Sequence, residues 1–183
     1  MADGNVLKCC FTGYRPQKFG FRLSGDDINY VRFENALTEW IMKLINEDCR
    51  IFYTGMAMGF DIIAAENVAL LKKARPELGI KIICVVPFLG QEKGFNDFWQ
   101  KKYNNIMSQS DEQIQLSDNY YSGCYQVRNK FMVDNCDCVL TWYDGKPGGT
   151  RNTLNYALKQ GRQVFNINGE CESIAFQTVF EII

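Results

Sequence analysis

The sequence predicts a single α/β domain built on a mostly parallel sheet with helices on both faces. Short apolar runs alternate with helix-length amphipathic stretches along the chain, and this alternation is typical of strand–helix–strand units. The run at residues 80–86 is continuously apolar, as expected for a parallel strand buried on both faces. With 183 residues and 46% hydrophobic composition, the chain can bury one sizeable core. We find no linker or internal repeat and expect one domain over residues 1–183.

The elements follow one another in a regular order. Strands are predicted over residues 7–12, 50–54, 80–86, 113–116, 139–142 and 163–167. Helices are predicted over residues 27–46, 62–74, 95–107, 125–135 and 153–161, and from about residue 172. The first helix carries apolar residues at helical spacing, among them Leu37, Ile41 and Leu44. The second is expected to stop at Arg75, because the residue before a proline is displaced from helical geometry.

Two glycine-bearing turns connect predicted strands to predicted helices. The first is TGMAMGFD, residues 54–61, and the second is DGKPGGTRNT, residues 144–153. Glycine lets backbone N–H groups approach a ligand closely, and a helix N-terminus adds unpaired donors and a partial positive charge. Together these features favour a bound anion such as phosphate. Neither turn matches GxGxxG or GxxxxGK[ST], so the common dinucleotide and ATPase fingerprints are absent.

Residues with ligand-binding chemistry gather where predicted strands end. In an open parallel sheet the ligand lies beyond the carboxyl ends of the strands, so these turns are expected to form one rim. The candidate ligand-binding residues supplied by the four turns are Thr12, Gly13, Arg15, Thr54, Gly55, Gly59, Asp61, Pro87, Phe88, Gly148, Gly149 and Thr150.

Each candidate also has a purely structural interpretation. The glycines are compatible with tight turns that need no ligand, and Arg15 with a surface ion pair. Asp61, in the first turn of a helix, is placed to complement the helix dipole. As a ligand group, Asp61 is better suited to ribose hydroxyls than to phosphate, whose charge it repels. Phe88 is interpreted more readily as a packing residue than as a base-stacking one.

Composition removes several classes of function. The chain has no histidine, which excludes Ser-His-Asp and Cys-His catalysis and any His-containing metal site, and we expect no metal. The N-terminal residues do not resemble a signal peptide, and no apolar run is long enough to span a membrane, so we expect a cytoplasmic protein with reduced cysteines. Twenty basic residues against 21 acidic ones argue against strong binding to nucleic acids.

The order of several motifs resembles a known family. TGYRP, TGMAMGFD, VPF, YQVRNKFMVDNCDCVLTWYDG and PGGT follow one another as in the YpsA-like branch of the SLOG superfamily, the Rossmann-like group that includes DprA and the LOG phosphoribohydrolases. The likeness runs from about Lys8 to about Asn166. It implies a Rossmann-like domain that binds a nucleotide or nucleotide-derived ligand, a cytoplasmic location and a homo-oligomer. It also implies a phosphate-facing role for Arg128, while the neighbouring Asn129 is either a ligand donor or a cap.

One departure from the LOG pattern bears on activity. LOG enzymes carry PGGxGTxxE, and here the segment reads PGGTRNTLN, with no carboxylate at the position of the glutamate. Cleavage of a glycosidic bond normally needs carboxylate assistance, so the catalytic residues are left unassigned. We therefore expect a protein that binds or senses an NAD- or ADP-ribose-like ligand. The alternatives are a LOG-like nucleoside-monophosphate phosphoribohydrolase and a DprA-like module that binds single-stranded DNA.

Overall fold

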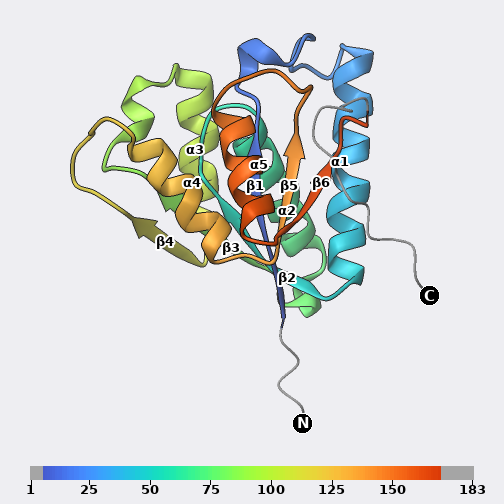
Figure 1. The fold of residues 1–183 in the computed structure, drawn as a ribbon. Coiled ribbons are helices and arrows are strands. Elements are labelled where there is room, and N and C mark those ends of the chain that lie inside the picture. The colour runs from blue at the N-terminus through green and yellow to red at the C-terminus, as the bar shows by residue number, and fades with distance from the viewer. Residues whose placement is uncertain (1–5, 170–183) are drawn as a thin grey trace.

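The structure, a computed structural model, describes residues 6–169 (Figure 1). Six strands form one sheet in the order β4-β3-β2-β1-β5-β6, and every neighbouring pair is parallel. The chain order reverses beside β1, whose two neighbours are β2 and β5. The prediction of a mostly parallel sheet in a Rossmann-like α/β domain is therefore confirmed.

The observed bounds follow the predicted alternation. The strands are β1 Leu7–Gly13, β2 Cys49–Thr54, β3 Lys81–Val86, β4 Glu112–Gln115, β5 Cys138–Trp142 and β6 Gln163–Asn166. The α-helices among the described residues are α1 Ile28–Asn46, α2 Phe60–Ala74, α3 Asp97–Gln109, α4 Cys124–Asp134 and α5 Gly149–Lys159. Three short 3-10 segments, Pro16–Lys18, Pro76–Leu78 and Gln91–Gly94, lie in the connections.

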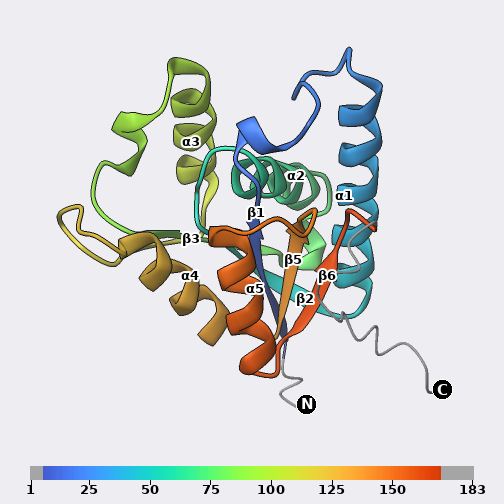
Figure 2. The ribbon, with the colours of Figure 1, turned by 45° about the horizontal axis from the view of Figure 1, so that its top comes forward.

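The helices form a layer on each face of the sheet (Figure 2). In one layer α2 packs between α1 and α3, and in the other α4 packs against α5. Right-handed crossovers explain this division: the chain moves along the sheet in one direction from β1 to β4 and in the opposite direction from β4 through β5 to β6. Helices on both faces were predicted from the sequence and are confirmed.

Aromatic side chains pack between β1, β2 and the layer of α1 and α2. Phe11 stacks on Phe52 with ring centroids 5.8 Å apart and meets Phe60 edge-on at 6.3 Å. All three side chains are fully buried, and Phe33 of α1 extends the cluster to Phe60 at 6.2 Å. This packing fixes the start of α2 against the end of β1, where the candidate site lies.

Two helices begin two or more residues earlier than the sequence predicted. α2 begins at Phe60 instead of residue 62, and α5 begins at Gly149 instead of residue 153. In both cases a glycine with positive φ precedes the helix, Gly59 at 94° and Gly148 at 149°, so the helix starts directly after the glycine. The helix predicted from about residue 172 lies outside the described residues. Within residues 6–169, no helix combines the length and apolarity that crossing a membrane requires.

Candidate functional site

The turns after β1, β2 and β5 meet at one edge of the sheet. Gly13 and Thr54 end β1 and β2, which are adjacent, and Gly13 pairs in register with Trp142 of β5. The Phe60 N–H donates to the carbonyl of Tyr14 at 3.0 Å, which joins the first turn to the second. The Thr150 hydroxyl donates to the carbonyl of Gly13 at 3.2 Å, which joins the first turn to the third.

Glycine at two of these positions is required by close packing. A Cβ on Gly13 would lie 2.5 Å from Cγ of Phe60, so a side chain there would displace α2. A Cβ on Gly59 would overlap the Tyr14 carbonyl, and the φ of Gly59 is itself unfavourable for other residues. Both glycines are therefore needed for the close packing of β1 against α2, whether or not they also contact a ligand.

The turn between β2 and α2 uses several of its own polar groups. The Met56 N–H donates to the Thr54 hydroxyl at 3.2 Å, and that hydroxyl donates to the Asp61 carbonyl at 3.1 Å. The Asp61 carboxylate accepts backbone hydrogen bonds from Ala57 and Gly13. Together with the bond from Phe60 to Tyr14, these contacts leave fewer donors for a bound anion than the glycine pattern alone suggests.

Asp61 and Arg128 are two buried ionisable side chains beneath this turn, with only 5% and 3% of their surfaces exposed. Burial raises the pKa of Asp61 to about 6, although the positive charge of Arg128 acts in the opposite direction. The Arg128 guanidinium donates to the Gly55 carbonyl and, through Nε, to Oδ1 of Asn129 at 2.7 Å. In this position Arg128 braces the 54–59 turn from below, and a Cβ on Gly55 would collide with its guanidinium.

The turn between β5 and α5 is more open. A Cβ built on Gly149 would meet no neighbouring atom within 4 Å. The first backbone hydrogen bond of α5 runs from the Asn152 N–H to the Gly148 carbonyl, at 3.1 Å. Among residues 6–169, the backbone N–H groups of residues 149–151 have no described hydrogen-bond acceptor. These groups point out of a helix N-terminus, which is the arrangement that binds anions in many proteins.

Basic side chains that the sequence analysis did not single out lie beside this open turn. The ammonium of Lys18 would be 3.2 Å from a Cβ on Gly148, and it lies 5.6 Å from the ring centre of Tyr14. Tyr14 is held by a hydrogen bond from its hydroxyl to Asp144, which also pairs with Lys146 at 2.7 Å. Lys18 falls in a short 3-10 segment after the TGYRP motif, and no local pattern in the sequence indicates that this segment turns back toward β5.

Aromatic rings gather beside the rim where β3 ends. Phe88 lies 5.5 Å from Tyr120 and 5.9 Å from Tyr125 between ring centres, and Pro87 before it is buried. The exposed Arg15 lies over the ring of Tyr125, with its guanidinium carbon 5.5 Å from the centroid. Tyr120 is 64% exposed, so this group presents an aromatic surface next to a positive charge.

The other predicted residues occupy supporting positions. Thr12 is buried in β1 beside Thr141 of β5. Asn129 donates to the Thr153 hydroxyl at 2.8 Å and lines, with Gly149, a narrow space of about 40 Å³ between α4 and α5. The structure thus brings the predicted residues to one edge of the sheet but divides them into exposed groups and buried ones that hold the turns.

Comparison with known proteins agrees with this architecture. The family model for YpsA, described as the YspA SLOG family, matches residues 9–178. The chain belongs to this family. A UPF0398 protein of Halalkalibacterium halodurans is 31% identical over 156 residues, covering 83% of this chain and 80% of the relative. UPF0398 protein YpsA of Bacillus subtilis is 26% identical over 155 residues, covering 83% of this chain and 84% of the relative.

Solved structures of DprA share the fold of this SLOG family member. DprA from Streptococcus pneumoniae matches with a TM-score of 0.57 and 16% identity, over 88% of this chain and 50% of DprA. Helicobacter pylori DprA, solved to explain its single-stranded DNA binding mode, matches with a TM-score of 0.58 and 18% identity, over 87% of this chain and 64% of DprA. The chain thus spans one half to about two thirds of these proteins.

The DprA likeness corrects one expectation. We expected no strong nucleic-acid binding because the net charge is −1, yet a protein of this fold is known for binding single-stranded DNA. The expectation was wrong because net charge averages over the whole surface, whereas binding depends on the local field. Here Arg15 and Lys18 are exposed on the same short segment after β1.

Proposed function

We propose that this SLOG protein binds a nucleotide or nucleotide-derived ligand, of the NAD or ADP-ribose kind, at the edge formed by the turns after β1, β2 and β5. The observation that carries the proposal is the open N-terminus of α5, where the N–H groups of residues 149–151 lack described acceptors and Lys18 lies beside Gly148. Backbone donors and an ammonium in one place match the needs of a phosphate group. A ligand of this class is consistent with a cytoplasmic protein.

Further groups at this edge are suited to the rest of such a ligand. The rings of Phe88, Tyr120 and Tyr125 offer a surface on which a base can stack, and Arg15 adds a cation next to it. Asp61 is too deeply buried to meet a ribose in this conformation, so we assign it to the internal support of the 54–59 turn.

A thermal-shift series tests this function. AMP, ADP, ADP-ribose, NAD and inorganic phosphate are added separately, because a ligand that binds only the folded chain raises its melting temperature. We expect a concentration-dependent rise with at least one nucleotide, and a smaller rise in Lys18→Met. Lys159→Met, at the opposite end of α5, is the matched control and should behave as wild type. No shift with any of these compounds would refute the proposal.

A second candidate function is the binding of single-stranded DNA. The observation that favours it is the pair of exposed tyrosines, Tyr120 at 64% and Tyr121 at 42%, on a fold shared with DprA. Tyr120 lies 6.4 Å from the ring of Tyr125, which is under Arg15. Fluorescence anisotropy with a labelled oligothymidylate at several salt concentrations tests it. Binding that weakens linearly with the logarithm of salt, and weakens further in Tyr120→Ala, would support this function. Absence of binding at low salt would exclude it.

A further inference from the structure

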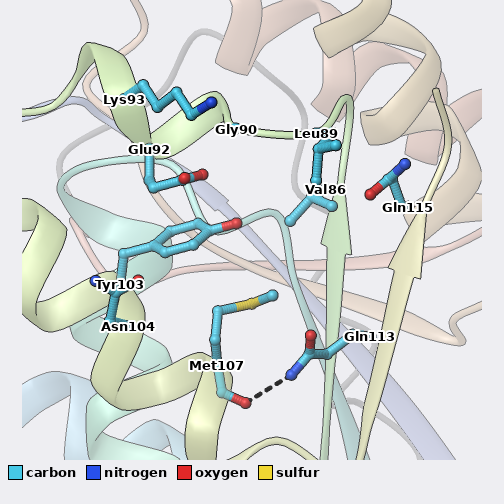
Figure 3. A pocket seen from close by; sticks show the side chains of 10 residues that line it. All are labelled: Val86, Leu89, Gly90, Glu92, Lys93, Tyr103, Asn104, Met107, Gln113 and Gln115. Carbon is cyan, nitrogen blue, oxygen red and sulfur yellow. Dashed lines mark hydrogen bonds between the residues drawn. The ribbon is translucent and has the colours of Figure 1, made fainter. Parts of the chain in front are cut away.

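A hollow of about 480 Å³ lies on the α3 side of the sheet (Figure 3). It is bounded by the ends of β3 and β4, by the segment 89–93 and by α3, and no residue of the proposed nucleotide site lines it. Val86, Leu89 and Met107 supply apolar surface, while the remaining lining is polar. Its volume falls in the range of small-molecule sites.

The hydrogen bonds of two glutamines fix which of their atoms face this hollow. Nε2 of Gln113 donates to the Met107 carbonyl at 2.8 Å, and Nε2 of Gln115 donates to Oδ1 of Asp118 at 2.9 Å. A carbonyl and an ionised carboxylate can only accept, so the amide nitrogens are held by these partners. Both Oε1 atoms are consequently left on the side of the hollow, as Figure 3 shows.

Charged groups of both signs lie at the mouth of the hollow. The Glu92 carboxylate points toward it above the Tyr103 ring (Figure 3). The aliphatic chain of Lys93 lies against Gly90. A Cβ on Gly90 would lie 3.1 Å from Cε of Lys93, so the glycine leaves room for the lysine side chain. Burial raises the pKa of the Tyr103 hydroxyl to about 12, so that hydroxyl keeps its proton at neutral pH.

We propose that this hollow binds a small zwitterionic amino acid, with its ammonium at Glu92 and its carboxylate at Lys93. An ammonium brings donors and no acceptor, which matches the Glu92 carboxylate, and the Gln113 and Gln115 amide oxygens are further acceptors in the lining. The exposed ammonium of Lys93 repels a simple amine but attracts the anionic end of a zwitterion. The aliphatic part of the ligand lies against Val86, Leu89 and Met107. This site shares no lining residue with the proposed nucleotide site, and Gln91, between Gly90 and Glu92, joins the two by donating to the carbonyls of Gly55 and Met56 at 3.4 and 3.3 Å.

The test compares ligands that differ only in charge. Glycine, 4-aminobutyrate and 6-aminohexanoate are titrated into the ¹⁵N-labelled chain, each beside the amine and the carboxylic acid of equal length, and the side-chain amide signals of Gln113 and Gln115 are followed. A ligand of so few atoms is expected to bind with a Kd near about 1 mM. At least one zwitterion should bind at least about tenfold more tightly than its amine and its acid.

Variants separate this site from the rest of the molecule. Glu92→Gln and Lys93→Met should each weaken zwitterion binding by about tenfold or more. Glu112→Gln removes the same charge from β4, at a position that alternates with Gln113 and so faces the other side of the sheet, and should leave binding unchanged. Absence of saturable binding, equal binding of the plain amine, or an equal loss in Glu112→Gln would overturn the proposal. Nucleotide-induced thermal shifts should survive in Glu92→Gln, so the two proposals fail separately.

Discussion

Buried Asp61 is the residue whose environment departs most from what its position in the sequence suggests. An aspartate in the first turn of a helix is usually a solvated partner of the helix dipole, but here it is 5% exposed beneath the 54–59 turn. Its carboxylate accepts from backbone groups of two different turns, those containing Gly13 and Ala57. It therefore ties β1 and β2 together at the cost of burying a charge.

The raised pKa of Asp61 predicts a specific pH dependence of stability. The pKa rises from 3.8 to about 6 on folding, so the contribution of Asp61 to the free energy of unfolding is largest below about pH 4 and is lost as pH rises through about 6. The shift corresponds to about 3 kcal/mol at 1.36 kcal/mol per unit. We expect Asp61→Asn to remove this decline, as measured by urea unfolding across pH.

The comparison with wild type isolates this effect, because other carboxylates contribute equally to both proteins. Glu39→Gln, on an exposed face of α1, serves as the matched control and should keep the wild-type profile. An unchanged profile in Asp61→Asn would show that the buried carboxyl is not the source.

At two glycines with positive φ, Gly79 and Gly59, adding a methyl group is expected to lower stability by different amounts. A Cβ on Gly79 would lie in open space, whereas a Cβ on Gly59 would overlap the Tyr14 carbonyl. Gly79→Ala should cost about 1 kcal/mol from backbone strain, and Gly59→Ala should cost about 2 kcal/mol more because β1 and α2 must separate. Denaturant unfolding of both variants measures the difference. Equal losses of unfolding free energy would show that the structure around Tyr14 accommodates the added methyl group without destabilisation.

At the scale of elements, the N-termini of α2 and α5 look alike in sequence but differ in how many of their backbone N–H groups are free to bind a ligand. Before α2, the Tyr14 carbonyl and the Asp61 carboxylate occupy donors of the turn. Before α5, residues 149–151 have no described acceptor within the part of the chain that the structure covers. The difference arises because α2 packs directly on the end of β1, whereas α5 starts beside it.

This difference predicts that Gly149 is the better position at which to test ligand binding. A side chain there meets nothing within 4 Å, so Gly149→Val should cost no more than about 1 kcal/mol of stability while blocking access to the N–H groups of α5. We expect nucleotide affinity, measured by calorimetry, to fall by at least about tenfold. Gly94→Val, also in open space, is the control. Full binding by folded Gly149→Val would remove this turn from the site.

A substitution at Gly55 gives a less direct answer than one at Gly149. There the added Cβ collides with the guanidinium of Arg128, so a loss of binding would report a disturbed turn as much as a blocked ligand.

At the scale of the whole molecule, the ionisable groups at this edge favour binding over hydrolysis. Arg128 keeps its proton at physiological pH and cannot act as a base, and Asn155 stands where LOG enzymes have a glutamate. Loss of general acid–base help typically removes ~10²- to 10⁴-fold in rate. Asp61, the nearest carboxylate to the first glycine turn, is buried and engaged with backbone donors.

We therefore expect poor phosphoribohydrolase activity. Purified protein is incubated with AMP, CMP and GMP, and free base and ribose 5-phosphate are followed by chromatography. Turnover of about one per second, within the usual range for enzymes, that is lost in both Asp61→Asn and Arg128→Lys would establish an enzyme instead. Arg128→Lys is chosen because a shorter residue would remove a donor to the Gly55 carbonyl and leave it only the longer bond from Gln91, at 3.4 Å.

The sequence alone determined the fold and the edge at which the candidate site lies. Apolar strands alternating with amphipathic helices specify a parallel sheet, and a parallel sheet brings the ends of β1, β2 and β5 to one edge. Glycine patterns marked the starts of α2 and α5, although their first residues were placed too late, because the capping glycines are followed by residues of low helix propensity or by bulky ones.

Only the tertiary structure decided which of these groups face outward. Burial of Asp61 and Arg128 and the approach of Lys18 to Gly148 depend on contacts between segments far apart in the chain. Sequence periodicity reports which face of an element is apolar, but it carries no information on which partner occupies a given hydrogen-bond donor. For that reason two glycine turns that look alike in the sequence differ in the structure: the first is hydrogen-bonded internally, and the second leaves an open helix N-terminus, which we propose as the anion site.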